Sequence, residues 1–360
     1  MPYAFNNPAF RLGGVMGGGT IIPTSTFVSA EIGAVDSATV VVTYSGAAPS
    51  VSSGHVVKVN SASVTIASHS ISGSTVRLTL ADAADALDTL LVSCSSGSGN
   101  IIAHTDSAVT NNAVSMASFG SLKVAFTARR PEYLGETAEV SPIDPVEDGD
   151  RIYTAVSPWG SGNNLVQATT ANQPIYEADG WVIFDKDTSP DRMVATLDAS
   201  DNGDFTIAIV FNTTDAYTAT TKELCGTWQV NLSVYAGHIF SLGQDTANRL
   251  GFYTDAMSWQ YVTTPTFNDG STFVVVYHGA VSGANQTITM YLAKIGTDSA
   301  LANVKSATAV NDPTPLTNFT VGSRVGGTNG FDGNMKEFIY YPGGVSDITA
   351  FLDHMALRWL

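Results

Sequence analysis

Short runs of alternating apolar and polar residues recur along this chain, and they constrain its fold more than any other feature. Val40, Val42 and Tyr44 share one side of such a run, and the segment 76–80 alternates in the same way. A period of two places every second side chain on the same face of a β-strand. Gly, Ser, Asn and Pro, which favour turns, separate the runs. The pattern therefore predicts an all-β protein.

The charge balance narrows the classes of partner. Charged residues are 13% of the chain, about half of the usual ~25%. The 32 acidic and 16 basic side chains give a net charge of −16. Such a surface repels phosphate groups, so we expect neither nucleic-acid binding nor attachment to anionic membranes. No apolar stretch reaches the ~18 residues of a membrane span, which predicts no membrane insertion.

The cysteines and the first residues bear on the compartment. Cys94 and Cys225 lie far apart and form no CxxC pair, so we expect two buried, unbonded thiols. The first residues lack the pattern of a signal peptide, although the composition is typical of extracellular adhesive proteins. A phage particle released by lysis would explain both observations, and secretion by a route without a signal peptide is the alternative.

Turn-rich and proline-rich stretches divide the chain into four predicted parts. Residues 1–25 are rich in Gly, Pro and Asn and are predicted to be a flexible arm or attachment peptide. Residues 26–119 read as an immunoglobulin-like β-sandwich, because short strands follow one another throughout. Residues 120–145 contain prolines that interrupt a strand ladder and are predicted to be a connector. Residues 146–360 form the second, longer domain.

The first domain resembles a known repeat. The segments 27–33, 40–44, 57–64, 73–80 and 109–114 are similar to the SwmB-type immunoglobulin-like repeat of bacterial surface proteins. That resemblance implies a spacer or display module without catalytic residues.

The second domain is predicted to be a sandwich followed by a helix. The run 205–211 alternates Phe and Ile on one face, and 272–277 is apolar on both faces, as expected for a covered central strand. Near the C-terminus, apolar residues recur at helical spacing after Ser346, a suitable N-cap. We expect this short helix to pack against the edge of the sandwich.

This domain also resembles a known family. This domain contains segments that are similar to the concanavalin A-like, laminin G-type jelly roll of phage and bacterial surface proteins, namely 159–164, 167–176, 180–185, 240–243, 249–253, 319–322, 331–333 and 337–340. The predicted fold class is thus all-β, with an N-terminal immunoglobulin-like sandwich, a concanavalin A-like jelly roll and a short C-terminal helix.

The sequence argues against catalysis. Retaining β-glucanases with this fold place acidic residues at alternating positions of one strand, in an ExDxE or ExDxxE pattern. Glu177 and Asp179 have the first spacing, but Trp181 and Val182 occupy the positions where a second Glu would stand. No GxSxG nucleophile motif occurs either. We therefore expect a non-enzymatic protein.

Calcium is the one cofactor that the sequence leaves open. Laminin G-type domains often bind Ca²⁺ through loop carboxylates, and oxygen-rich spacing occurs at Asp185, Asp187 and Asp191 and again at Asp201 and Asp204. The alternative is that these residues form Asx turns beside Gly and Pro. Both readings stand at this point.

A glycan site is predicted where rings and polar groups occur together. Tyr253, Asp255, Trp259 and Tyr261 combine these groups, with Trp228 as a further ring. Aromatic side chains also dominate sandwich cores, so burial is the alternative for each ring.

Together these features suggest a fibre or spike on the surface of a phage or phage-like particle. The jelly roll would bind a host cell-surface polysaccharide, and the N-terminal arm would attach to other particle proteins. Weak single sites need multivalency, so we expect a homo-oligomer. The alternatives are a purely structural virion decoration or tail protein and a secreted, extracellular bacterial adhesin.

Overall fold

The computed structural model describes most of the chain, and some predicted residues lie outside it. It describes residues 24–33, 38–81, 83–95, 99–138, 145–159, 163–186, 190–197, 203–215, 222–226, 229–231, 234–236, 238–244, 247–254, 257–262, 265–310, 318–323 and 330–360. Residues 1–23 of the predicted arm and four predicted site residues fall outside these ranges, namely Asp187, Asp201, Trp228 and Asp255.

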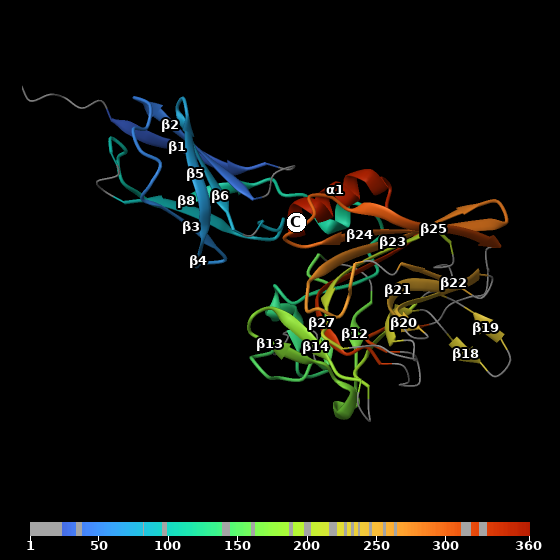
Figure 1. Ribbon diagram of the computed structural model, residues 1–360. Coiled ribbons are helices and arrows are strands. Elements are labelled where there is room, and N and C mark those ends of the chain that lie inside the picture. Colours follow the sequence, from blue (N-terminus) through green and yellow to red (C-terminus); the bar gives the residue numbers. More distant parts are fainter. Residues whose placement is uncertain are drawn as a thin grey trace, which may run out of the picture.

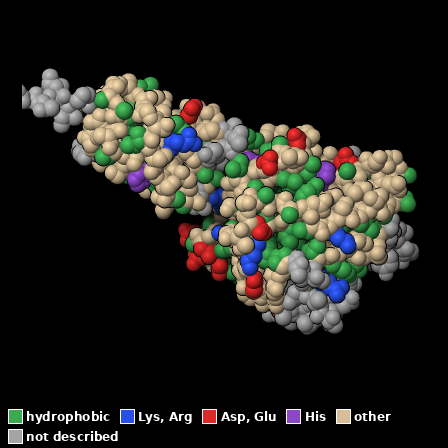
Figure 2. Space-filling view, turned by 45° about the horizontal axis from the view of Figure 1, so that its top comes forward, with side chains coloured by type: hydrophobic (Ala, Val, Ile, Leu, Met, Phe, Trp, Pro, Cys, Tyr) green, Lys and Arg blue, Asp and Glu red, His purple; other side chains and the backbone are tan. Residues whose placement is uncertain are grey.

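The chain forms two β-sandwiches at opposite ends of an elongated molecule, with a helix near their junction (Figure 1). The predicted all-β class, with two sandwiches and one short C-terminal helix, is confirmed. Figure 2 shows a surface on which charged side chains are few, in keeping with the composition.

The N-terminal sandwich contains eight strands in the order β4-β3-β7-β8-β1-β2-β6-β5. A parallel contact between β1 and β8 joins its two halves. The strands are β1 (Ser25–Ile32), β2 (Thr39–Gly46), β3 (His55–Val59), β4 (Ala62–Val64), β5 (Ile66–Ser72), β6 (Thr75–Leu80), β7 (Leu90–Cys94) and β8 (His104–Asn111).

The alternation in these strands produces the first core. Val40, Val42 and Tyr44 of β2 point inward and pack with Val76 and Leu78 of the neighbouring β6, all at most 2% exposed. Removing these side chains from water supplies the main stabilisation of the sandwich, at ~25 cal/mol per Å² of apolar surface.

The C-terminal sandwich stacks two large antiparallel sheets. The nine-stranded sheet contains, in spatial order, β10 (Leu134–Gly135), β11 (Thr154–Ala155), β12 (Leu165–Val166), β15 (Met193–Thr196), β26 (Asn318–Val321), β17 (Lys222–Gly226), β20 (His238–Gln244), β21 (Ala247–Thr254) and β22 (Met257–Val262). The second sheet contains β13 (Ile175–Glu177), β14 (Trp181–Phe184), β27 (Gly333–Pro342), β16 (Phe205–Asn212), β23 (Phe273–Ser282), β24 (Asn285–Lys294) and β25 (Ala302–Val310), with β9 (Val124–Thr127) paired to β27.

Minor elements complete the domain. The strands β18 (Gln229–Asn231) and β19 (Val234–Ala236) form a separate hairpin, and three 3₁₀ turns are η1 (Met116–Ser118), η2 (Pro131–Tyr133) and η3 (Thr170–Asn172).

Strand β16 is buried on both faces. Phe205, Ile207, Ile209 and Phe211 point into the space between the two sheets, as the alternation predicted. The intervening Ala208 and Val210 belong to a second apolar cluster on the other side of the sheet. Both faces of the central strands must therefore be covered, one by the nine-stranded sheet and the other by a helix.

That helix is α1 (Ile348–Trp359), and two details of its prediction are wrong. Its N-cap is Asp347, whose carboxylate accepts from the backbone N–H of Ala350 at 3.1 Å, whereas the Ser346 hydroxyl donates to the Phe119 carbonyl. Its buried Phe351 and Met355 cover the face of the central strands rather than the sandwich edge. The reason is the apolar outer face of these strands, which an edge position would leave in water.

The predicted connector, residues 120–145, also differs. Val124–Thr127 is fully buried as β9 and pairs with β27, and Leu134–Gly135 forms β10 of the nine-stranded sheet. Strand β9 precedes Pro131, and β10 lies between Pro131 and Pro142, so no proline removes a ladder donor from either strand.

The two cysteines are buried and form no disulfide, as predicted. Burial raises the pKa of the Cys225 thiol well above its usual value, and the nearby Glu223 adds to the rise.

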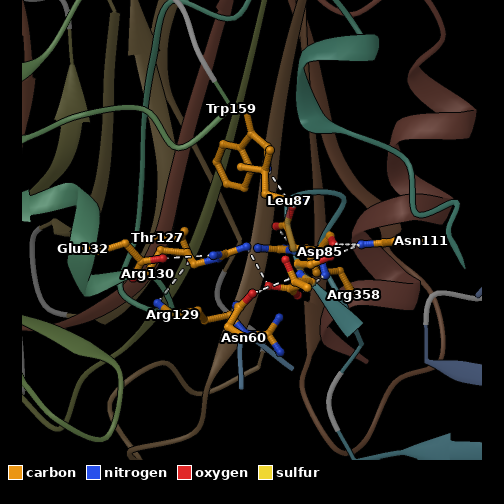
Figure 3. A network of polar contacts seen from close by, with 12 residues as sticks. Asn60, Asp85, Leu87, Asn111, Thr127, Arg129, Arg130, Glu132, Trp159 and Arg358 are labelled. Atoms are coloured by element: carbon orange, nitrogen blue, oxygen red, sulfur yellow. Dashed lines mark hydrogen bonds and ion pairs between the residues drawn. The ribbon is translucent and has the colours of Figure 1, made fainter. Parts of the chain in front are cut away.

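Buried polar contacts join the two sandwiches (Figure 3). Arg358 of α1 donates to Asp85 of the first domain at 2.8 Å and to Glu337 of β27 at 2.7 Å. The indole N–H of Trp159 donates to the other oxygen of Asp85 at 3.0 Å. We call these four residues the interdomain joint.

The joint is charged and buried. Burial alone would raise the pKa of Asp85. The Arg358 charge and the hydrogen bonds from Trp159, the Leu87 backbone and Arg358 together outweigh burial and hold that pKa below its usual value. Nearby, Arg130 pairs with Asp88 at 2.6 Å, again across the two domains. Because buried charges are costly unless each has a partner, this set of contacts fixes one relative arrangement of the sandwiches.

Candidate functional site

The outer face of the nine-stranded sheet carries the candidate site at its β21–β22 edge (Figure 1). Leu250 and Phe252 of β21 are buried between the two sheets. Because side chains alternate along a strand, Arg249, Gly251 and Tyr253 lie on the opposite face, away from that core.

Three aromatic rings form a continuous row on this face. Gly251 pairs with Tyr261 of β22, which places Tyr261 and Trp259 on the same side as Tyr253. The centroids of Tyr253 and Trp259 are 5.1 Å apart, and those of Trp259 and Tyr261 are 5.8 Å apart with an interplanar angle of 7°. We call Tyr253, Trp259 and Tyr261 the aromatic row. Each ring is half-buried, so the row keeps part of its surface in solvent.

Gly251 leaves room for the Tyr261 ring of the aromatic row. A Cβ atom at this position would come within 2.8 Å of Tyr261 Cδ1 and closer still to the Gln260 carbonyl oxygen. Contacts this short do not occur around real Cβ atoms, and the carbonyl belongs to the backbone. The glycine therefore allows the Tyr261 ring to lie across β21.

Arg249 extends the row at its Tyr261 end. Its guanidinium carbon lies 5.3 Å from the centroid of the Tyr261 ring, a cation–π distance. Its Nε–H is buried and has no hydrogen-bond acceptor among the described residues. Among the described residues, no carboxylate lies within ion-pair distance of it. The side chain is thus in contact with the ring, and no described carboxylate compensates its charge.

The aromatic row contains three of the five residues predicted for glycan binding. Tyr253, Trp259 and Tyr261 lie together, whereas Trp228 and Asp255 lie outside the described residues. Sequence reasoning missed Arg249. Its signal was present in the alternation, since Arg249 precedes Gly251 and Tyr253 at a spacing of two.

The first predicted calcium group lies in a loop after β14. The Asp191 carboxylate accepts from the backbone N–H of Asp185 at 3.0 Å, and the Asp191 N–H donates to the Asp185 carbonyl at 2.8 Å. Burial raises the pKa of Asp191 to about 7. The Asp191 carboxylate thus makes its hydrogen bond within its own loop.

The second predicted calcium group lies at the other end of the sheet. Asp204 precedes β16, and its carboxylate accepts from the backbone N–H of Val281 at 2.6 Å. Phe184, next to Asp185, pairs with Gly333 at the start of β27, whereas Phe205, next to Asp204, pairs with Pro342 at its end. The two predicted calcium groups therefore lie at opposite ends of this strand. Within the described residues, no group of three His, Cys, Asp or Glu side chains could hold a metal ion. Calcium binding stays a prediction.

A buried carboxylate also occupies the outer face of the sheet. Glu223 of β17 is 0% exposed and pairs with Ser241 of β20, which in turn pairs with Gly251. On its other side Glu223 bridges to Gly330. Its described cross-strand neighbours therefore provide no second carboxylate of the kind that a two-acid glycosidase needs.

In the part of the chain that the structure describes, no helix has the length and apolarity needed to cross a membrane.

Comparisons with known proteins find likeness in structure only. Family models and curated proteins yield no match. A GH54 α-L-arabinofuranosidase mutant soaked with 4-nitrophenyl α-L-arabinofuranoside is similar at a TM-score of 0.42 and 12% identity, over 58% of this chain and 52% of that chain. The chain thus spans about half the length of that enzyme.

Two smaller structures are also similar. The Ruminococcus gnavus IT-sialidase CBM40 bound to α2,3-sialyllactose gives a TM-score of 0.33 and 12% identity, over 49% of this chain and 97% of that chain. The VIP36 exoplasmic/lumenal domain, in its Ca²⁺/Man3GlcNAc-bound form, gives 0.32 and 11%, over 54% and 90%. The SwmB-like and phage details stay predictions.

Proposed function

We propose that this chain is a non-enzymatic surface component, a fibre or spike, of a phage or phage-like particle. Its C-terminal sandwich binds a polysaccharide of the host cell surface, and its N-terminal sandwich is a spacer. The residues before the first strand attach it to other particle proteins, and several copies assemble into a homo-oligomer.

The observation that carries the proposal is the aromatic row on an outward sheet face. Protein cores bury such rings, yet Tyr253, Trp259 and Tyr261 keep part of their surface in solvent. The apolar face of a sugar ring can stack on this surface, and rings fixed by their neighbours lose little entropy when a ligand binds. A strand-borne row also suits an extended polymer, since successive side chains on one face repeat along the strand.

Substitution of the central ring tests the proposal. Trp259→Ala should weaken binding of the full chain to purified host capsular polysaccharide about 30-fold, because an anchoring ring contributes ~2 kcal/mol. Biolayer interferometry with immobilised polysaccharide measures this change. Because Trp259 contacts two rings, circular dichroism should first show that the variant folds.

Trp181→Ala provides the matched control. Trp181 is also half-buried, lies under the ammonium group of Lys336 at 4.6 Å, and belongs to the other sheet. Its loss should leave binding unchanged. Equal binding to capsulated and capsule-deficient cells would contradict the proposal and favour a purely structural virion role. Release of reducing ends from the polysaccharide would contradict the non-enzymatic part.

A further inference from the structure

We infer that the glycan bound by the aromatic row is anionic, and that Arg249 recognises its charged group, a carboxylate or a sulfate ester. The inference rests on the proposed function, because it concerns the ligand of the same site.

The position of Arg249 is the first argument. Its guanidinium lies 5.3 Å from the Tyr261 centroid, at one end of the aromatic row. A sugar stacked on Trp259 and Tyr261 would extend toward this cation. A guanidinium presents several N–H donors in one plane and can bind two oxygens of an oxyanion at once.

The missing counter-ion is the second argument. The chain has twice as many acidic as basic side chains, so acidic partners are plentiful, and Arg130 and Arg358 pair with Asp88 and Asp85. Arg249 has no such partner among the described residues, and its buried Nε–H has no acceptor. An oxyanion would supply both an acceptor and a counter-charge.

The chemistry separates this ligand from a neutral sugar. A neutral sugar could stack on the rings without using the positive charge, so removal of the charge would scarcely affect it. An anionic sugar must approach a protein with a net charge of −16, and a cation beside the site offsets this repulsion. Binding should therefore depend on Arg249 and weaken as salt screens the ion pair.

Matched polymers test the inference. Binding of the full chain is measured to polygalacturonate and to its carboxyl-reduced form, which share one backbone, and to dextran sulfate and dextran. We expect the protein to bind at least one charged polymer about tenfold more tightly than its neutral match, since hydrogen bonds to charged groups are stronger than hydrogen bonds to neutral groups. The pair that shows the preference identifies carboxylate or sulfate as the recognised group.

Three variants give the decisive comparison. Arg249→Gln should abolish the preference, because binding to the charged polymer should fall to the level of its neutral match. Lys305→Gln, which removes the same charge from β25, should leave the preference intact. Trp259→Ala should weaken binding to both polymers.

The outcomes distinguish the two proposals. A preference that survives in Arg249→Gln, or wild-type binding to neutral polymers alone, would overturn the inference and leave glycan binding standing. Binding to none of the four polymers or the host polysaccharide would count against the proposed function itself.

Discussion

At the scale of single residues, the N-terminal core contains a directed chain of hydrogen bonds. His55 Nδ1 lies 2.9 Å from the Ser52 carbonyl, so this nitrogen donates and Nε2 accepts from the Tyr44 hydroxyl at 2.7 Å. His104 Nε2, 3.1 Å from the same hydroxyl, then donates to it, and His104 Nδ1 accepts from the Ser107 hydroxyl at 3.0 Å. Every group is satisfied when both imidazoles are neutral.

This chain predicts acid sensitivity of the N-terminal sandwich. Burial lowers the pKa of His55 and of His104 from their usual value of ~6.5. The stability that they contribute is therefore full above pH ~6.5 and is lost as the pH falls from there toward their folded pKa values. The midpoint of thermal unfolding of this sandwich should be lower at pH 5 than at pH 8.

Burial also lowers the pKa of His354 in the other domain, to about 4, so His354 adds its own acid sensitivity to the whole protein. A variant of His104 separates the contribution of the N-terminal sandwich from that of His354. His104→Gln should reduce the drop in midpoint between pH 8 and pH 5. An unchanged drop in the variant would contradict the proposed role of the two histidines.

At the scale of elements, α1 supplies the cover of the central strands. Phe351 is fully buried and makes edge-to-face contacts with Phe119 and Tyr341. Phe351→Ala should lower the free energy of unfolding by about 3–5 kcal/mol, because it leaves a cavity. Chemical denaturation measures this loss. Leu357→Ala, on the same helix but 46% exposed, should cost far less, and equal losses would show that α1 does not depend on its buried face.

The elements also show what the sequence could predict. The alternation in 205–211 and the helical spacing after Ser346 identified β16 and α1, because both patterns are local. Local patterns do not say which surface a helix covers, and α1 was placed at the edge. Likewise β9 is only four residues long, and its pairing with β27 depends on residues far along the chain.

The same distinction applies to the functional residues. Tyr253, Trp259 and Tyr261 occur within one stretch of sequence, so their proximity could be predicted. Asp85 and Arg358 contact each other from the two domains, and no short motif relates them.

At the scale of the whole molecule, Arg358 links the two sandwiches. Arg358→Met should loosen this link and destabilise the protein by about 3–5 kcal/mol, because Glu337 and Asp85 would remain buried without their cation. Small-angle scattering should show a wider range of domain arrangements, and denaturation should measure the loss. Adding Glu337→Gln should restore part of the stability, since it removes one uncompensated charge. A variant as stable and as rigid as the wild type would contradict this role.

The position of β27 has a consequence for biosynthesis. This strand lies between β14 and β16 in the sheet, although it follows both by a long stretch of chain. The partners of the N-terminal strands, by contrast, all lie within 25–111. During translation, the N-terminal sandwich can fold soon after it leaves the ribosome. The C-terminal sheet must wait for β27, so a ribosome that stalls before that strand would release a polypeptide with one finished half and one aggregation-prone half.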